Sequence, residues 1–394
     1  MGPAVLRALR QIVAVTAIGL RAIPERVGAS LVIVIGMALV VAVTISILSM
    51  SVGFMRTVRN TGRIDRAIVL SQGSLYEFGS AISRDNVITI ADAPGIRTAG
   101  DGKPIVSAES LASVVVTKKS NGLDAYVLLR GVGPEGFALR PEIRLVGGRM
   151  FRPARHELIV GKSALAQFGG LEVGSQVPLP EGDWTVTGSF ESNGDEHESE
   201  LLSDSETVLS AMRTNTFHSV TVMLERPESL EQFRAAINAN PTLAVDIKRE
   251  TEFLATQSKY VNDFLTMIAS VVGGIMGLGA IFGALNTMYS AISARAIEIA
   301  TLRAIGFGGG AVVASVLAES LVLAFSGAVI GAIVAWIAFN GDLHSAGGLV
   351  FRLAVTPGLV GLGIGFASIL GFVGGLFPAI RAASLPIAAA LRAT

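Results

Sequence analysis

Four long stretches without charged residues constrain this chain most, because each is long enough to cross a lipid bilayer. They cover residues 27–55, 264–294, 304–341 and 353–380, and the third is interrupted once, by Glu319. A helix needs about 20 apolar residues to span the hydrocarbon core. The first stretch exceeds the roughly 7–15 apolar residues of a secretory signal, so we expect a permanent span there as well. The sequence therefore predicts a membrane protein with four transmembrane helices.

The composition agrees with a membrane protein and excludes several classes of function. Hydrophobic residues make up 51% of the chain and charged residues 16%, whereas a typical soluble protein has about 25% charged residues. The formal net charge is zero, so nothing indicates nucleic acid as a partner. The chain has no cysteine, which excludes disulfides, thiolate nucleophiles and thiolate metal ligands.

Lysine and arginine residues beside the spans predict the orientation, because short cytoplasmic segments are rich in them. The amino-terminal segment holds four arginines, the segment after the second span holds Arg295 and Arg303, and the tail holds two more. The loop after the third span holds only Arg352. We therefore expect both termini and residues 294–307 in the cytoplasm, and the large region between the first two spans outside.

The expected fold is a membrane α-helical protein with four transmembrane helices and a large extracytoplasmic α+β domain, the ectodomain, inserted between helices 1 and 2. The expected cytoplasmic parts are an amino-terminal segment over 1–28, a short helix over 294–307 and a tail over 379–394. The expected spans cover 29–54, 264–293, 311–338 and 355–378, and an external loop covers 339–354. The ectodomain is expected over 55–262, with a stalk helix at about 250–263.

The ectodomain sequence mixes strand and helix signals. Short apolar runs bounded by turn residues predict strands over 125–132, 156–161, 183–190 and 219–225. Runs that begin on a capping serine predict helices over 163–170 and 229–241. At about 200 residues, the region can hold one or two small domains with their own cores. We expect two lobes of strands and helices threaded through one another.

Patterns that would indicate catalysis or metal binding are incomplete. Lys162 and Ser163 follow Gly161 as in a phosphate-binding loop, but His156 occupies the position where that loop needs another glycine. The acidic run 194–200 could attract a divalent cation, but it lacks EF-hand spacing, and we interpret it as a solvated loop. No nucleophile, base and orienting group form a known catalytic pattern. We therefore expect no enzymatic activity, bound cofactor or metal in this chain.

The segment that leads back to the membrane predicts a helical stalk. Between residues 251 and 268, apolar side chains recur at steps of seven, four and three, the spacing of a narrow seam that packs on another helix. We assign the stalk seam to Leu254, Val261 and Leu265 and expect the helix to continue unbroken into the second span. Such a stalk would carry rigid-body motion between ectodomain and membrane. A solvated linker helix is the alternative.

Glycine pairs four residues apart recur in the spans. Small residues at this spacing let helix backbones approach closely, and we prefer this interpretation to a pore lining. Four helices are too few to enclose a conventional translocation path, so we expect a homodimer with eight. The pairs assigned to helix packing are Gly273 with Gly277, Gly327 with Gly331, and Gly371 with Gly375, and two further pairs are Gly279 with Gly283 and Gly361 with Gly365.

Glu319 is the one charged residue within a predicted span. An intramembrane carboxylate is by default a candidate for function, such as proton binding. However, no second acidic residue or histidine occurs in any span to form a proton relay. We favour a position near the cytoplasmic interface, where Glu319 pairs with another group or reaches water, and its role stays open.

Residues 294–307 form a short polar elbow between two spans. As a helix, this segment places Arg295 and Glu298 three residues apart on one surface. A short rod with a small-residue face and few charges suits docking into a groove of another protein, and an ordinary interfacial turn is the alternative. The expected small-residue strip consists of Ala296, Ala300 and Ala304.

The elbow resembles a known signature. Residues 298–306, EIATLRAIG, are similar to the R-E-I-G-x-x-R-A-x-G-A pattern of the MacB-like or FtsX-like ABC transporter permeases. Glu298, Arg303 and Gly306 match the pattern, whereas Ile297 replaces the usual arginine and Ala300 the usual glycine.

The resemblance extends over nearly the whole chain. The carboxyl-terminal residues 375–393, GLFPAIRAASLPIAAALRA, are similar to the family's G-L-Y-P-A-x-R-A-A-x-x-P-x-x-A-L-R, with Arg381 and Arg392 in place. Residues 130–151 and 157–179 resemble its ectodomain pattern. One span, a large outward domain and three further spans are also the family's order.

The resemblance implies a stand-alone permease subunit of an ABC transporter in the inner membrane. Residues 294–307 would be the coupling helix that contacts a cytoplasmic ATPase through Arg295, Glu298, Arg303 and Gly306. Two ATPase copies would serve a homodimer or paired permease, and ATP and Mg²⁺ would be bound by the ATPase. Stalks would pass the motion to the ectodomain, a process called mechanotransmission, for efflux across the cell envelope. A periplasmic adaptor is a further partner that the resemblance allows.

Alternative functions stay open beside the export hypothesis. An FtsX-like membrane regulator or scaffold that controls an extracytoplasmic partner has the same architecture, as does a lipoprotein-releasing permease. A proton-driven carrier is disfavoured because Glu319 has no ionisable partner within a predicted span. Drug, peptide, lipid and lipoprotein all stay possible as cargo.

Overall fold

The computed structural model describes residues 3–21, 23–179, 181–346 and 349–386. The chain divides into two compact units. The membrane unit comprises Met1–Val52, Asp263–Gly341 and Ala354–Thr394, and the ectodomain comprises Gly53–Asn262 and Asp342–Leu353. Residues 387–394 of the predicted tail, with Arg392, lie outside the described residues.

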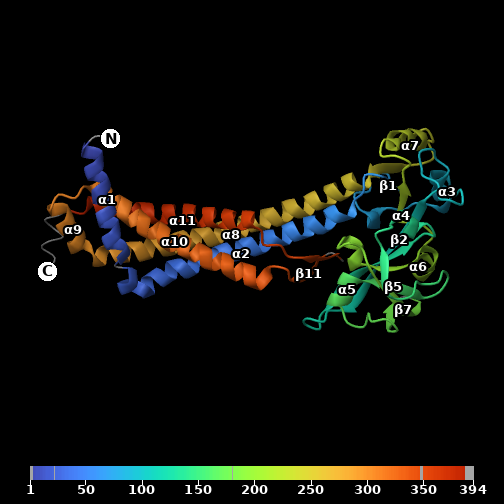
Figure 1. Cartoon of the computed structure of the whole chain (residues 1–394), viewed down its shortest axis with the longest axis horizontal. Helices are drawn as coiled ribbons and strands as arrows, with labels where there is room; N and C mark the ends of the chain where they lie inside the picture. Colours follow the sequence, from blue (N-terminus) through green and yellow to red (C-terminus); the bar gives the residue numbers. More distant parts are fainter. Residues whose placement is uncertain (1–2, 22, 180, 347–348, 387–394) are drawn as a thin grey trace. The chain divides into compact units, whose positions relative to one another are not determined.

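In the described part of the chain, four helices are long and apolar enough to cross a membrane (Figure 1). Together with the α/β domain between the first two, they confirm the predicted fold class. Helices α2, α8 and α11 continue beyond the predicted spans into polar sequence, whereas α10 exceeds its predicted span only by two glycines and a phenylalanine. The helices are α2 (Val27–Thr61), α8 (Glu250–Ala294), α10 (Gly309–Phe339) and α11 (Pro357–Ser384).

Glycines mark the places where helices of the membrane unit approach most closely. A Cβ atom on Gly327 of α10 would lie 2.5 Å from the carbonyl oxygen of Val34 on α2, and one on Gly331 would overlap the carbonyl of Ala38. Only glycine permits this approach of α10 to α2. The other four assigned positions also face neighbours closely: Gly273 faces Thr44, Gly277 faces Leu370, Gly371 faces Ala324 and Gly375 faces Ser320.

The two remaining glycine pairs differ from these. A Cβ atom on Gly279, Gly283, Gly361 or Gly365 would meet no heavy atom within 4 Å. Close packing within one chain therefore explains three of the five glycine pairs but not these two.

The amino-terminal segment folds into a helix, α1 (Pro3–Arg21), followed by the short η1 (Ile23–Arg26). This helix is absent from the sequence-based expectations. Its signal is the amphipathic spacing of residues 12, 15, 16, 19 and 20, which share one helical face. Val15 and Gly19 on that face are buried. The Ser315 hydroxyl of α10 donates a hydrogen bond to the carbonyl of Val15, 3.1 Å away.

The ectodomain is built on a ten-stranded mixed sheet in the order β10-β1-β9-β2-β3-β8-β5-β7-β4, with β6 added to β7. The strands are β1 (Arg66–Ser71), β2 (Val106–Thr117), β3 (Asp124–Val132), β4 (Arg144–Gly148), β5 (Glu157–Gly161), β6 (Gln176–Leu179), β7 (Gly182–Glu191), β8 (Leu201–Asp204), β9 (Ser219–Met223) and β10 (Val245–Arg249). The helices are η2 (Glu77–Gly79), α3 (Arg84–Ala91), α4 (Gly136–Leu139), α5 (Lys162–Gln167), η3 (Glu196–Ser199), α6 (Ser205–Ala211) and α7 (Ser229–Asn238). The four predicted strands and two predicted helices are confirmed as β3, β5, β7, β9, α5 and α7.

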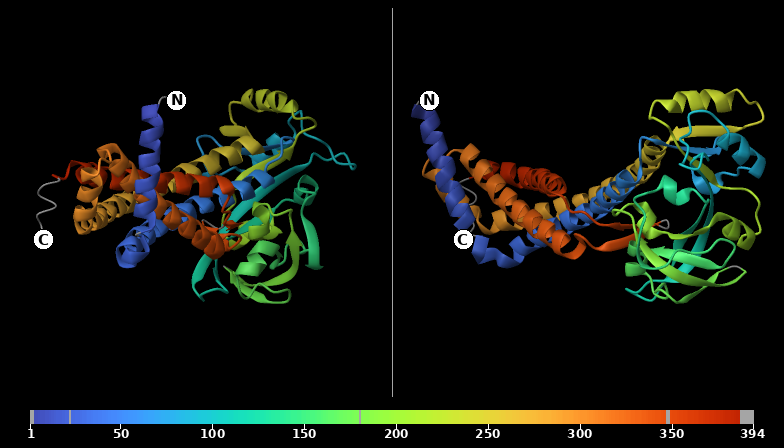
Figure 2. Two further views of the ribbon diagram at one scale, coloured as in Figure 1. Left: turned by 60° about the vertical axis from the view of Figure 1, so that its left-hand side comes forward. Right: turned by 45° about the vertical axis from the view of Figure 1, so that its right-hand side comes forward.

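Two apolar cores divide the ectodomain into two lobes (Figure 2). In one lobe, α3 and α7 pack on β1, β9 and β10, with Phe233 fully buried. In the other lobe, α5 and α6 pack on strands β3 and β5–β8 around Trp184 and Phe168. Strand β2 pairs first with β9 and then with β3, so one strand serves both lobes.

The loop between α10 and α11 contributes to the ectodomain. It forms an antiparallel hairpin of β11 (Leu343–Ala346) and β12 (Leu349–Arg352). Val350 is 3% exposed within the core around Trp184, and its carbonyl accepts a hydrogen bond of 2.9 Å from the Ser199 hydroxyl. The rings of Phe351 and Phe54 meet edge to face, with centroids 5.7 Å apart. The predicted external loop is thus part of the ectodomain core.

The interpretation of residues 194–200 as a solvated loop is wrong. Asp195, His197 and Glu200 are buried. Arg130 of β3 donates two hydrogen bonds to Glu200, two to Glu77 and one to Glu109, at distances of 2.7–3.1 Å. Buried carboxylates need such partners, and the five N–H groups of Arg130 satisfy the buried Glu109 and Glu200 together with the half-buried Glu77.

Candidate functional site

The elbow contains a separate helix, α9 (Ala296–Ala304). Arg295 alone separates it from α8, with backbone angles of φ −106° and ψ 12° that belong to neither helix. At its other end, Ile305 to Gly308 lead into α10. The coupling segment is therefore a short rod with a backbone joint at each end.

Gly306 ends α9 because it adopts φ +106°, which residues with a side chain rarely adopt. Its N–H donates a hydrogen bond to the carbonyl of Arg303, and the N–H of Phe307 donates one to the carbonyl of Leu302, both 3.1 Å long. This bond pair is a Schellman motif, which satisfies the last carbonyls of a helix. Gly306 thus has a structural reason for its place in the signature.

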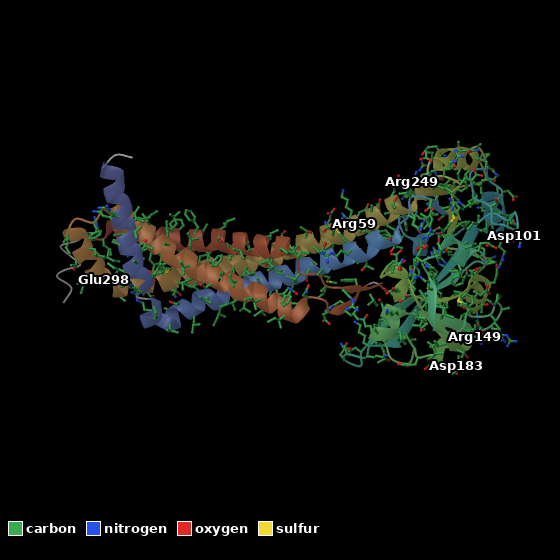
Figure 3. The ribbon with its side chains drawn as sticks, viewed as in Figure 1. Arg59, Asp101, Arg149, Asp183, Arg249 and Glu298 are labelled. Atoms are coloured by element: carbon green, nitrogen blue, oxygen red, sulfur yellow. The ribbon has the colours of Figure 1, made fainter. Side chains whose placement is uncertain are left out.

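Arg295 and Glu298 form a bidentate ion pair on α9. The Nε and Nη2 atoms of Arg295 donate to the two carboxylate oxygens at 2.8 and 3.0 Å. This hydrogen bonding lowers the pKa of Glu298, so the carboxylate stays charged at neutral pH. The Glu298 side chain, which is labelled in Figure 3, is 43% exposed according to its accessible surface. It offers a fixed negative charge at the surface of the elbow.

The exposed face of α9 differs from the predicted small-residue strip. Ala300 is 1% exposed and packs inside the membrane unit together with Ile299, whereas Ala296 is half-buried and Ala304 is exposed, so the three alanines do not form one outward-facing strip. Periodicity alone did not show which side of the rod the membrane helices cover. The exposed side presents Ile297, Glu298, Thr301 and Ile305. This set is the docking face of the site.

Two further polar contacts fasten the elbow within the membrane unit. The Arg303 Nη1 atom donates a hydrogen bond of 2.6 Å to the carbonyl of Leu385, just after α11. The side-chain amide of Gln11 on α1 reaches the carbonyl of Gly306 at 3.4 Å and the N–H of Gly308 at 3.5 Å. Arg303 therefore holds α9 to the end of α11. Sequence reasoning missed Gln11 because it missed α1.

Glu319 lies close to the elbow. Its Oε2 atom is 3.5 Å from the Nη1 atom of Arg295. The two side chains are 8% and 13% exposed, respectively. The structure thus pairs the intramembrane carboxylate with the arginine at the α8–α9 joint.

The residues of the predicted stalk seam all lie on α8. Leu254 is buried within the ectodomain against Val58 of α2 and Phe253. Val261 is half-buried, and Leu265 is buried within the membrane unit. At Leu254 the seam therefore packs on α2 of the same chain.

The described residues contain no group of three or more histidine, aspartate and glutamate side chains that could hold a metal ion. The elbow itself presents a charged and apolar surface rather than an enclosed pocket with reactive groups. Such a surface can bind another protein.

Comparisons with known proteins agree with this architecture. The sequence model of the MacB-like periplasmic core domain matches residues 30–240, and that of the FtsX-like permease C-terminal matches residues 270–387. The uncharacterized ABC transporter permease YknZ of Bacillus subtilis (strain 168) is 25% identical over 194 residues, which cover 46% of this chain and 47% of that protein. The match spans about half the length of that relative.

Two solved structures resemble part of the chain. The periplasmic region of MacB from Actinobacillus actinomycetemcomitans has a TM-score of 0.38 at 15% identity, covering 52% of this chain and 96% of that one. The extracellular domain of the noncanonic ABC-type transporter YknZ from Gram-positive bacteria has a TM-score of 0.35 at 14% identity, covering 46% of this chain and 99% of that one.

Proposed function

Because this chain belongs to the MacB-like and FtsX-like permeases of ABC transporters, we propose that it transmits motion from a separate cytoplasmic ATPase to its ectodomain. The chain is a multi-pass membrane permease. In the proposed orientation both termini and α9 lie in the cytoplasm and the ectodomain lies outside. ATP and Mg²⁺ would be bound and used by the ATPase.

One observation carries this proposal: α8 is a single unbroken helix that connects the ectodomain sheet to the elbow. Strand β10 ends at Arg249 and α8 begins at Glu250, while α8 ends at Ala294 and α9 begins two residues later. Hydrogen bonds within a helix make it stiff, so force that passes the joint at Arg295 has a continuous helical path along α8. This stiffness supports mechanotransmission over a channel mechanism.

The docking face of α9 supports an ATPase as the partner. Ile297 is 47% and Ile305 71% exposed, and the charged Glu298 lies between them on the surface. Exposed apolar side chains around a fixed charge are typical of a protein interface, in which the apolar groups supply affinity and the charge supplies orientation.

We also propose that two copies of the chain act together with two ATPase copies. Glycines that face open space at Gly279, Gly283, Gly361 and Gly365 support a second copy packing in the membrane, because small residues allow close helix contacts there. Export across the envelope, with or without a periplasmic adaptor, is the proposed purpose.

The proposal is tested by purifying the tagged chain from its native membranes and identifying the co-purifying proteins by mass spectrometry. We expect an ABC-type ATPase with the wild type and a loss of at least about tenfold with Glu298→Arg, because the change reverses the charge at the docking face. Glu225→Arg, which makes the same change at an exposed ectodomain residue, is the control and should retain the ATPase. Absence of any ATPase from the wild type would refute the proposal.

The same experiment separates export from regulation. A periplasmic adaptor among the co-purifying proteins would favour an efflux machine. A secreted hydrolase bound together with the ATPase would favour an FtsX-like regulator, and a lipoprotein would favour a releasing permease.

A further inference from the structure

Glu319 is the one charged residue of α10, and the proposed function leaves it without a role. We propose that Arg295 and Glu319 form a clamp that makes α9 and the first turns of α10 move as one body. Arg295 is thus a positioning residue of the coupling machinery. The clamp is a property of this chain alone, and only its purpose, the transfer of force from an ATPase, rests on the proposed function.

The need for a clamp follows from the two joints of α9. Arg295 breaks the helix on one side. On the other side, Gly306 and Gly308 flank a single residue before α10, and both are exposed. Glycine has the greatest backbone freedom of any residue, so this connection bends easily. The amide of Gln11 is a weak brace, because its hydrogen bonds of 3.4 and 3.5 Å are near the limit of such bonds. Arg303 fastens the other end of α9 to the end of α11 but not to α10. Without a contact near Arg295, the start of α9 could tilt without moving α10.

Arg295 supplies that contact because its guanidinium binds in two directions. Nε and Nη2 hold Glu298 of α9, whereas Nη1 points to Glu319 of α10. The planar guanidinium fixes the angle between its donors, so one rigid group sets the position of both carboxylates. The residue whose backbone forms the α8–α9 joint therefore also ties that joint to α10.

Burial strengthens the contact between Arg295 and Glu319. Neither side chain is more than 13% exposed. A carboxylate in a membrane-spanning helix is costly unless it is paired, and removal of one partner from a buried pair leaves an uncompensated charge. Tilting α9 away from α10 would incur this cost, which resists the movement.

Helix α1 packs against the ion pair of Arg295 and Glu319. A Cβ atom on Gly19 would lie 2.9 Å from Ser315 Oγ, 3.6 Å from Glu319 Oε2 and 3.8 Å from Arg295 Nη1. Glycine at this position lets α1 pack directly over the ion pair, and Ser315 bonds to the backbone of the same helix. Three elements that are separate in sequence therefore meet at one guanidinium.

The clamp can be tested through the distance between α9 and α10. The chain has no cysteine, so spin labels at Thr301→Cys and Val322→Cys, both exposed positions, report this distance by electron paramagnetic resonance in lipid nanodiscs. We expect a narrow distance distribution in the labelled wild type and a broad one in Glu319→Leu. Glu319→Gln should be intermediate, because its amide oxygen still accepts a hydrogen bond but carries no charge.

Glu225→Gln, which removes an exposed carboxylate of the ectodomain, is the control for the distance measurement, and its distribution should stay narrow. Glu298→Gln removes the other carboxylate held by the same guanidinium and should broaden the distribution. The Glu319 variants remove a charge from the membrane, which favours insertion, and Arg295 keeps its ion pair with Glu298. Equal widths in wild type and Glu319→Leu would overturn the clamp.

A second measurement addresses the purpose of the clamp. With the ATPase that co-purifies with the wild type, Glu319→Leu should retain ATPase binding within about twofold but reduce the permease-dependent stimulation of ATP hydrolysis by about tenfold, as expected for a lost coupling energy. Glu225→Gln, a charge removal at an exposed ectodomain residue, should change neither.

Full stimulation in Glu319→Leu would overturn the role in coupling. Failure of the wild type to retain any ATPase would refute the proposed function, whereas the distance measurement would still decide whether the clamp exists.

Discussion

At the residue scale, buried charges are the least expected feature of this protein. Glu319 in the membrane unit and the run 194–200 in the ectodomain each place carboxylates away from water. In each case an arginine from another element pairs with one buried carboxylate, Arg295 with Glu319 and Arg130 with Glu200. Replacing such a pair by well-packed apolar residues is often neutral, whereas removing one partner is strongly destabilising.

One ectodomain carboxyl in this run should make stability depend on pH. Burial raises the pKa of Glu196 to about 8, from an ordinary value of 4.5. Between these values the folded state holds a proton that the unfolded state has lost, so the free energy of unfolding should fall as the pH rises. The contribution of one such group is up to about 1.4 kcal/mol per pH unit. Glu196→Gln should flatten this part of the pH profile.

Trp184 provides the measurement. It is fully buried in the ectodomain, and the only other tryptophan is Trp336 of α10, so a Trp336→Phe background leaves one reporter. Urea unfolding followed by Trp184 fluorescence from pH 5 to 9 would give the profile. If the free energy of unfolding depended on pH in the same way in Glu196→Gln and in the Trp336→Phe background, Glu196 would titrate normally.

At the element scale, the structure is organised by helices that approach at glycine and by strands with buried faces. These features were predictable because their signals are local: glycines four residues apart, uninterrupted apolar runs and strand alternation. Gly306 was also predictable from its signature, and its φ of +106° now explains it.

The contacts between elements were not predictable from the sequence. Arg130 and Glu200 lie 70 positions apart, and Ser199 and Val350 lie 151 positions apart. Periodicity carries no information about such pairs, so the acidic run looked like a solvated loop. For the same reason the sequence did not predict which side of α9 is the docking face, since the burial of Ala300 depends on neighbouring helices.

Helix approach at glycine gives a prediction for the membrane unit. Gly331→Leu should separate α10 from α2, because its side chain would overlap the carbonyl of Ala38. Overpacking of this kind typically costs about 1–3 kcal/mol. Gly361→Leu is the matched control, since a Cβ atom there meets nothing within 4 Å in the same unit.

The stabilities of these two variants in detergent would be compared by steric trapping or by thermal denaturation. We expect a lower midpoint for Gly331→Leu only. If Gly361→Leu destabilised equally, close packing at Gly331 would not be the cause. If Gly361→Leu instead changed the oligomeric state, the open glycines would be at a contact between copies.

At the scale of the whole molecule, the chain passes between the membrane unit and the ectodomain four times, near residues 52, 262, 341 and 353. Two of these passages are the unbroken helices α2 and α8. The other two are the ends of the segment that carries β11 and β12. The loop between α10 and α11 is therefore an attachment of the ectodomain rather than a simple connection between spans.

This attachment predicts that a residue between the last two spans contributes to ectodomain stability. Val350→Ala removes apolar volume from the core around Trp184, where Val350 is 3% exposed, and should lower the free energy of unfolding of the ectodomain by about 2 kcal/mol. Val115→Ala makes the same chemical change at a residue that is 52% exposed and should cost less than about 0.5 kcal/mol. Urea unfolding of the full chain, followed by Trp184 fluorescence, compares the two. If both variants unfolded like the wild type, the hairpin would contribute no stability to the core, and motion of α10 and α11 would reach the ectodomain only through α2 and α8.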